Sequence, residues 1–271
     1  MFSSVTDAHV FGSLSSNSAI IAKGYSVLPR EFSTEAYRYI FANPGQIIDA
    51  YKVTLFVVIV GTFLSLFLIT MTAYVLYRKE FPYRNIIAFY FYFTTLFSGG
   101  LVAYYILTIR YLYLKNTLVA LILPGIFNVF NTFVMRTFMS TTIPYSLIES
   151  AKLDGAGDFQ IYRSVVLPLM KPALASIGLF ITLNYWNDWW NAMLFIDKSN
   201  MMPLQYVLYR VLSSAESFAR NASNIAGVRV TMPSESMKLA LTVVVTGPIV
   251  FVYPFVQKYF VQGIMIGSVK G

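Results

Sequence analysis

The stretch Val53–Tyr77, which reads VTLFVVIVGTFLSLFLITMTAYVLY, contains no Asp, Glu, Lys, Arg or His. A helix needs about 20 apolar residues to cross the hydrocarbon layer of a bilayer, so this stretch predicts a membrane-spanning helix. The whole chain agrees, because 57% of its 271 residues are hydrophobic, only 12% are charged and the mean hydropathy is +0.62. A soluble domain carries roughly 25% charged residues. The sequence therefore predicts an all-α membrane protein.

Four further apolar stretches have a comparable length, and only Asp188 interrupts them with a charge. They are Asn85–Ile109, Asn116–Met135, Pro172–Ile196 and Leu239–Gln257. We therefore expect a polytopic protein with five transmembrane helices, its transmembrane domain covering residues 51–271. The short loop Arg78–Arg84 is rich in basic residues, which favours the cytoplasmic side for that loop. The tail, residues 258–271, is then cytoplasmic, and residues 1–50 and an outer loop of residues 197–238 lie outside.

The composition excludes several kinds of chemistry. The chain has no cysteine and one histidine, His9, so thiolate catalysis and metal sites built on Cys or His pairs are not available. The dipeptide Gly-Lys never occurs, so the chain cannot form a P-loop of its own. The net charge of +8 is spread over many loops, which is typical of membrane-flanking charge and not of nucleic-acid binding. We expect no metal, no cofactor and no catalytic residue.

The segment of residues 143–172, between the third and fourth apolar stretches, reads IPYSLIESAKLDGAGDFQIYRSVVLPLMKP. Pro144 suits the first turn of a helix over Tyr145–Leu153, and Gly155 supplies the left-handed residue that ends it. Asp158 is then expected to cap a second helix over Phe159–Leu167. The sequence predicts a compact helix-corner-helix that projects from the bilayer and fits a socket on a partner protein. We call residues 143–168 the knuckle.

The knuckle resembles a known motif. Its spacing, Glu149-Ser150-Ala151-x₃-Gly155-x₉-Val165-x-Leu167-Pro168, is similar to the E-A-A-x₃-G-x₉-I-x-L-P loop of the membrane subunits of binding-protein-dependent ABC importers. The resemblance implies that the knuckle is a coupling helix seated in a cleft of a separate ATPase subunit, with Glu149 paired to a basic residue there and Gly155 forming the corner. The coupling residues that it implies are Glu149, Ser150, Ala151, Asp154, Gly155, Ala156, Leu167 and Pro168.

The C-terminal residues extend the resemblance. Tyr253–Phe260 and Gly263–Gly271 are similar to the end of sugar-importer permeases of type I, in particular the maltose-type and complex-oligosaccharide subgroup. In that subgroup such a tail lies along the ATPase dimer interface, which implies this role for Gly263, Gly267, Lys270 and Gly271. The family usually has six spans, and its first helix precedes a segment resembling Phe2-Ser3-Ser4. We therefore expect that the first helix is missing from this sequence, with an authentic five-span member of the family as the alternative.

Polar side chains interrupt the fourth apolar stretch. Asn184, Asn187, Asp188 and Asn191 have the spacing i, i+3, i+4 and i+7, which places them on one face if the stretch is a continuous helix. An Asp within the membrane costs at least about 2.5 kcal/mol, so such residues usually face a cavity or a polar partner. Indole rings flank the stripe, and carboxamides with indoles suit sugars. We expect a substrate path lined by Asn184, Trp186, Asn187, Asp188, Trp190 and Asn191. A tryptophan belt at the membrane interface and asparagine-mediated helix packing are the alternatives.

These observations predict a permease subunit of an ATP-driven carbohydrate importer in a bacterial cytoplasmic membrane, with an oligosaccharide as substrate. The resemblance implies three kinds of partner: ATPase subunits that hydrolyse ATP, a second homologous permease that completes the pathway, and an external sugar-binding protein. Two alternatives remain at this point. One is an ion-coupled secondary transporter that uses Asp188, and the other is an ABC permease for a non-sugar solute.

Overall fold

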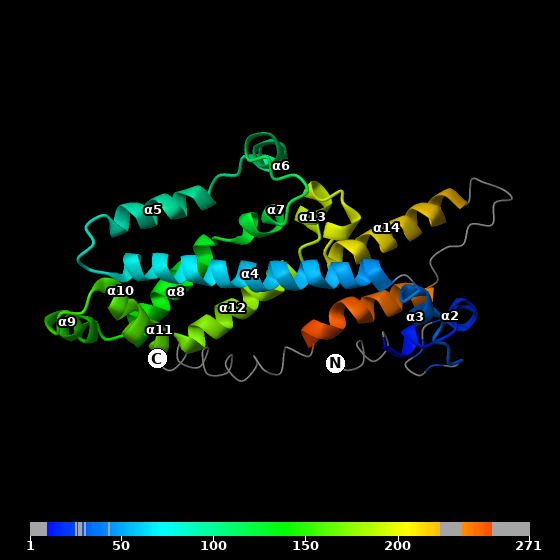
Figure 1. Ribbon diagram of the computed structural model, residues 1–271, viewed down its shortest axis with the longest axis horizontal. Helices are drawn as coiled ribbons and strands as arrows, with labels where there is room; N and C mark the ends of the chain where they lie inside the picture. Colours follow the sequence, from blue (N-terminus) through cyan, green and yellow to red (C-terminus); the bar gives the residue numbers. More distant parts are fainter. Residues whose placement is uncertain are drawn as a thin grey trace. The chain divides into compact units, whose positions relative to one another are not determined.

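The computed structural model describes residues 10–24, 26, 29, 31–42, 44–222 and 235–250, and the regular elements in these ranges are helices (Figure 1). The one strand-like contact among them is an isolated antiparallel bridge between Ser15 and Phe32. The all-α class is therefore confirmed. The chain divides into two units: the first comprises Met1–Leu55 and Asn187–Val252, and the second comprises Phe56–Trp186 and Tyr253–Gly271.

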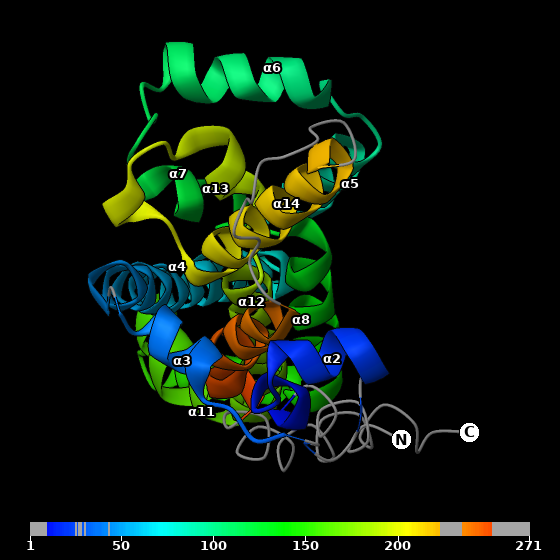
Figure 2. The ribbon, with the colours of Figure 1, turned by 90° about the vertical axis from the view of Figure 1, so that its right-hand side faces the viewer.

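The first unit is built from short helices and one amphipathic helix. Its elements are a turn of helix at residues 10–13, α2 (Asn17–Lys23), α3 (Glu35–Ile40), the first part of α4 (Pro44–Tyr77), α13 (Trp190–Phe195), η4 (Ser199–Met201), α14 (Leu204–Ala222) and a helix of residues 235–250. Figure 2 shows α2 beside the helix of residues 235–250, where the backbone N–H of Glu235 donates to Oδ1 of Asn17 at 2.9 Å. The first part of α4 holds α14 through Thr54, whose hydroxyl accepts from the N–H of Leu204.

The second unit contains the rest of α4 and the elements that follow it as far as α12. They are α5 (Arg84–Thr95), α6 (Gly100–Ile106), the π-helical turn η1 (Leu107–Tyr111), α7 (Val119–Ile122), η2 (Leu123–Gly125), α8 (Val129–Thr142), α9 (Tyr145–Leu153), α10 (Asp158–Ile161), the π-helical turn η3 (Tyr162–Val166), α11 (Leu167–Leu169) and α12 (Lys171–Trp186). Helix α8 contacts both α5 and α12. Neither α5 nor α6 has a buried residue, and both expose bulky apolar side chains.

Helix α4 confirms the first predicted span and is longer than expected. It begins at Pro44 rather than Val53 and runs for 34 residues, or about 51 Å at 1.5 Å per residue. Among the described residues, α4 is the one continuous helix long and apolar enough to cross a membrane, and the number rises to four if each of three bent helix pairs is one span. The second, third and fourth predicted spans are therefore bent or broken helices rather than single straight ones. The fifth lies partly outside the described residues.

The second predicted span, Asn85–Ile109, is broken in the middle. Helices run over Arg84–Thr95 and Gly100–Tyr111, and their axes meet at 111°. Gly100, the first residue of the second helix, has a φ of +77°, a left-handed conformation that glycine adopts without a steric penalty. A count of apolar residues does not detect this break.

The third predicted span, Asn116–Met135, also has a bend, of 51°, between Val119–Gly125 and Val129–Thr142. Asn128 has extended backbone angles, and its Oδ1 accepts the N–H of Asn131 at 2.9 Å, so a new helix is capped there. Helix α8 then continues beyond Met135 to Thr142.

The fourth predicted span, Pro172–Ile196, is not one helix. Helix α12 ends at Trp186, and α13 begins four residues later at Trp190. On its other side, α12 meets Asp158–Leu169 at a bend of 82°. Pro172 suits the first turn of a new helix because it has no N–H to lose there, which agrees with a start of α12 at Lys171.

Tyr185 packs against two glycines in the middle of the second unit. Its hydroxyl donates to the carbonyl of Ile122 at 2.9 Å and lies 3.2 Å from the hydroxyl of Ser65. A Cβ atom on Gly61 would lie 2.7 Å from two ring carbons of Tyr185, and one on Gly125 would lie 3.1 Å from the ring. The side chain thus joins α4, η2 and α12 where glycine leaves room for the ring.

We expect Gly61→Ala to destabilise the protein, because the added methyl group overlaps the Tyr185 ring and forces the helices apart. Overpacking of this kind costs about 1–3 kcal/mol, which a thermal melt in detergent detects as a lower Tm. Gly45→Ala is the matched control on the same helix, since a Cβ there meets nothing within 4 Å. Equal Tm values for the two variants would contradict the packing role of Gly61.

Candidate functional site

The knuckle forms the predicted helix-corner-helix. Helix α9 covers Tyr145–Leu153, and Gly155 has a φ of +82°. The N–H of Gly155 donates to the carbonyl of Lys152 and the N–H of Ala156 donates to that of Ala151, both at 2.9 Å. This pair of hydrogen bonds is a Schellman motif, which satisfies carbonyls at the helix end and turns the chain sharply. The expectation that Gly155 makes the corner is confirmed in its geometry.

The knuckle has one anchored side and one open side. Ile148 of α9 and Ile161 of α10 are fully buried. In contrast, Leu153 is 89% exposed and Phe159 is 62% exposed. Glu149 is exposed as well, on the same short helix as Leu153. Large apolar side chains on an open surface next to a charged group are typical of a protein–protein contact.

Arg78 joins the knuckle to the end of α4. Its side chain is only 8% exposed. The guanidinium donates through Nη1 to the Tyr74 hydroxyl at 2.7 Å and to Oδ1 of Asp158 at 2.9 Å, and through Nε to Oε2 of Glu80 at 3.1 Å. Lys152 adds its Nζ at 3.8 Å from Asp158 and at 3.9 Å from Glu80. We call Arg78, Glu80, Tyr145, Lys152 and Asp158 the clasp.

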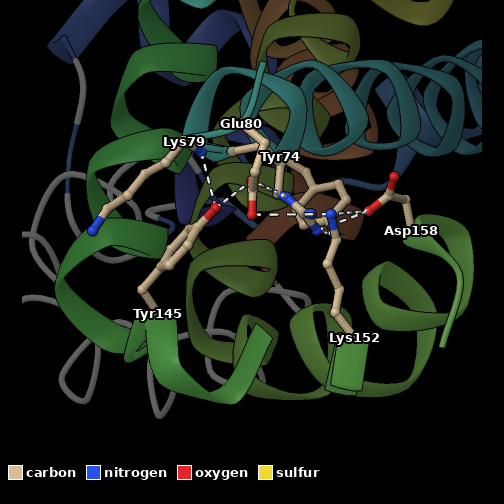
Figure 3. A network of polar contacts seen from close by, with 7 residues as sticks. Tyr74, Lys79, Glu80, Tyr145, Lys152 and Asp158 are labelled. Atoms are coloured by element: carbon tan, nitrogen blue, oxygen red, sulfur yellow. Dashed lines mark hydrogen bonds and ion pairs between the residues drawn. The ribbon is translucent and has the colours of Figure 1, made fainter. Parts of the chain in front are cut away.

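Tyr145 makes a second connection in the clasp. Its hydroxyl donates to Oε2 of Glu80 and accepts the N–H of Lys79 at 3.0 Å (Figure 3). The pKa of the Glu80 carboxyl is lowered to about 2, chiefly because of the hydrogen bond from Tyr145, with Arg78 adding to the effect and partial burial opposing it. Glu80 is therefore ionised at every physiological pH.

The role expected of Asp158 is wrong. Asp158 was predicted to cap the second helix, but Gly157 occupies the cap position and no side chain bonds there. Asp158 is instead the first residue of α10 and pairs with Arg78. The second helix also differs from the predicted Phe159–Leu167, because the chain changes to the π-helical turn η3 and then to α11. Leu167 and Pro168 lie in α11, where Leu167 is half-buried and Pro168 is exposed.

The polar stripe of the fourth span does not form one helical face. Asn184 is exposed on α12 and Trp186, the last residue of that helix, is buried, whereas the other predicted residues follow the break. Oδ1 of Asp188 accepts the N–H of Asn191 at 3.0 Å, and its Oδ2 accepts Nδ2 of the same residue at 2.8 Å. Asp188 thus binds the first turn of α13 from the residue before the N-cap position, which Trp189 occupies, and the single helix that the i, i+4 spacing assumed is interrupted after Trp186.

Helix α14 supplies neighbours that the sequence did not predict. Nε2 of Gln205 donates to Oδ1 of Asn187 at 3.0 Å. The ring of Tyr209 stacks on that of Trp189, with centroids 4.3 Å apart and planes at 16°. The exposed ring of Trp190 meets Trp189 edge to face. This segment was expected to be a loop, and the amphipathic period of residues 204–222 is the missed signal that predicts the helix.

The structure does not describe the C-terminal tail, and the search for a metal site covers the described residues alone. The tail residues Gly263, Gly267, Lys270 and Gly271 lie outside the described residues. A search of the described residues finds no cluster of three His, Cys, Asp or Glu side chains able to hold a metal ion.

The fold and the knuckle together define an all-α membrane protein with a helix-corner-helix that has one open, partly apolar side. No protein-family model matches the chain. It is 38% identical over 252 residues to the polygalacturonan/rhamnogalacturonan transport system permease protein YtcP of Bacillus subtilis (strain 168), which covers 93% of this chain and 87% of the relative. It is 36% identical over 262 residues to protein LplC of the same organism, covering 97% of this chain and 87% of LplC.

A more distant relative and a solved structure agree. The arabinooligosaccharides transport system permease protein AraQ of Halalkalibacterium halodurans is 27% identical over 249 residues, covering 90% of this chain and 81% of AraQ. A chain in the crystal structure of a bacterial ABC transporter involved in the import of the acidic polysaccharide alginate matches with a TM-score of 0.82 and 30% identity, over 95% of this chain and 90% of that one. The chain therefore belongs to the family of permease subunits of carbohydrate ABC importers.

Proposed function

We propose that this chain forms half of the translocation path of an oligosaccharide importer and docks an ATPase subunit through its knuckle. The observation that carries the proposal is the knuckle itself: an exposed α9 with a Gly155 corner, anchored by buried side chains on one side and open on the other. ATP hydrolysis then takes place in the partner. A second homologous permease completes the path, and an external binding protein delivers the sugar. The chain crosses the cytoplasmic membrane several times, with the knuckle on the inner side.

The proposed ATPase contact uses the open side of the knuckle. Leu153 and Phe159 provide apolar area, and Glu149 provides a charge for a basic residue of the ATPase. Ser150 and Ala151 are small, so a partner surface can approach α9 closely. We include the other knuckle residues named above and the tail residues Gly263, Gly267, Lys270 and Gly271 in the same proposal.

We propose an oligosaccharide as substrate because the similar proteins are described as permeases for polygalacturonan/rhamnogalacturonan and for arabinooligosaccharides. The residues around the break between α12 and α13 suit such a ligand. Carboxamide and carboxylate groups bind hydroxyl groups, and exposed indole faces pack against sugar rings. We therefore keep Asn184, Trp186, Asn187, Asp188, Trp190 and Asn191 as the proposed path, although Trp186 is buried.

The test is co-purification and transport of the intact complex. The chain is tagged and isolated from its native membrane, the proteins that accompany it are identified, and the complex is placed in vesicles with its external binding protein. We expect an ATPase and a second permease to accompany it, and labelled acidic and neutral oligosaccharides to enter only with ATP. A chain that purifies alone and drives uptake from an ion gradient would overturn the proposal.

The charge of Asp188 is expected to matter for transport beyond its hydrogen bonds to Asn191. Asp188→Ser retains a side-chain oxygen for the first turn of α13 but removes the carboxylate, and we expect assembly to persist while uptake falls about tenfold, as for loss of a charged hydrogen bond to a ligand. Asn128→Ser, which exchanges the cap of α8 in the same way, is the control and is expected to retain uptake. Full uptake by Asp188→Ser would show that Asp188 only holds the first turn of α13.

A further inference from the structure

Arg78 is a full positive charge at a buried position, directly after the last residue of α4. Burial of an arginine in a membrane protein costs free energy unless its donors are paired, and here two carboxylates and a phenol pair with it. A leucine or methionine would fill the same space without that cost. The pairing therefore needs an explanation beyond packing.

The partners of Arg78 come from different segments of the chain. Tyr74 belongs to α4, Glu80 to the loop after it, and Asp158 to the first turn of α10, on the far side of the corner. Glu80 in turn holds Tyr145, the first residue of α9, and contacts Lys152 in its last turn. The clasp thus contacts the knuckle at three places: Tyr145 at the beginning of α9, Lys152 at its end, and Asp158 after the corner (Figure 3).

Other contacts also join the knuckle to α4: the hydroxyl of Tyr162 in η3 lies 2.7 Å from that of Thr70, the ring of Tyr162 packs against that of Tyr74, and the ring of Tyr145 meets that of Tyr77 edge to face. Ile148 is the one buried side chain of α9, and Ile161 is the corresponding one of α10. The hydroxyl of Tyr77 donates to the carbonyl of Ile143, before α9 begins. Apolar contacts are non-directional and permit sliding, whereas the forked guanidinium fixes both distance and orientation.

We propose that Arg78 is a positioning residue which, through Glu80 and Asp158, fixes the knuckle to the end of α4, so that a displacement of the knuckle moves α4 as well. The inference rests on the proposed coupling of the knuckle to an ATPase. Because α4 is a continuous helix of 34 residues, a movement of its end is carried along its length. Without the clasp, only the hydroxyl, aromatic and apolar contacts join the knuckle to α4, and α4 follows the knuckle less closely.

The experiment uses the complete importer in vesicles and measures sugar transported per ATP hydrolysed. The variants are Arg78→Gln and Asp158→Asn. Asp158→Asn removes one carboxylate from an exposed side chain, so folding is not at risk. We expect the ATPase to co-purify in the wild-type amount and ATP hydrolysis to continue, while the transport ratio falls at least about fivefold, the low end of typical coupling between sites. Arg84→Gln, which removes an arginine from the same loop, and Asp49→Asn, which breaks an exposed ion pair on α4, are the controls.

Three outcomes overturn the inference. An unchanged transport ratio in Arg78→Gln and Asp158→Asn shows that the clasp does not transmit movement. A loss of ATPase binding in proportion to the loss of uptake shows that the clasp only shapes the docking surface. An equal fall in the two controls shows that any change of charge has the effect. A wild-type complex without ATP-dependent uptake, in contrast, would refute the proposed function itself, and so the two failures are distinguishable.

Discussion

Glu149→Lys is expected to release the ATPase from the permease and to abolish uptake. Glu149 is exposed on α9, and no ion pair within the described residues engages it, so its charge is available to a partner. A lysine there opposes the basic residue that we propose on the ATPase. Removal of one partner of a charge pair at an interface costs about 2–5 kcal/mol, which corresponds to at least about thirtyfold in affinity. Co-purification through a tag on the permease measures the loss.

The controls for this prediction separate charge from folding. Glu149→Gln removes the charge without reversing it and is expected to give an intermediate loss. Glu35→Lys reverses a charge on α3, which is not part of the knuckle, and is expected to leave the ATPase bound. A Glu149→Lys complex that retains its ATPase at wild-type stoichiometry contradicts the proposed contact.

The knuckle could be predicted from the sequence because its determinants are local. Pro144 before α9, the helix formers within it and Gly155 after it act within one short segment, and the structure has α9 over the predicted Tyr145–Leu153. A glycine after a run of helix formers predicts a left-handed residue whatever the rest of the chain does. The Schellman hydrogen bonds at Gly155 and Ala156 follow from the same local chemistry.

The helix breaks could not be predicted from the count of apolar residues. That count registers hydrophobicity, and the breaks depend on backbone angles at single residues. Gly100 and Asn128 are uncharged, so a count of charges treats them like any other apolar or polar residue. Yet Gly100 has a φ of +77°, and Asn128 caps a new helix. The pair Asn187-Asp188 also indicates a helix break, since both residue types favour the ends of helices. The i, i+4 spacing favoured one continuous helix instead, and so the break was missed.

The clasp could not be predicted because its partners are distant in sequence. From the sequence, Arg78 is one basic residue of a predicted cytoplasmic loop, and Asp158 is a predicted cap of the second knuckle helix. Only the fold brings the end of α4 to the beginning of α10 and reduces the exposure of the arginine to 8%. A charged residue directly after a long apolar run is normally solvated or at a headgroup, so sequence alone gives no reason to expect it buried.

Gly155→Val is expected to reduce uptake at least about tenfold, through the backbone and not through a lost contact. A Cβ on Gly155 meets nothing within 4 Å, so space is not limiting. Its φ of +82° is the difficulty, since a residue with a side chain pays about 1–2 kcal/mol to remain left-handed and a β-branched one pays more. The corner then relaxes, and α10 with Asp158 changes direction relative to α9. Because both the docking surface and the clasp depend on that direction, uptake responds more strongly than stability does.

A graded series at this corner tests the reasoning. Asparagine adopts the left-handed region most readily among residues with a side chain, so the expected order of uptake is wild type, then Gly155→Asn, Gly155→Ala and Gly155→Val. Gly157→Ala is the matched control: a Cβ there also meets nothing within 4 Å, and Gly157 has an ordinary φ of −70°. Uptake by Gly157→Ala should equal that of wild type. If Gly155→Asn and Gly155→Val transport equally, the left-handed corner does not determine how the knuckle is presented, and the side chains around it do.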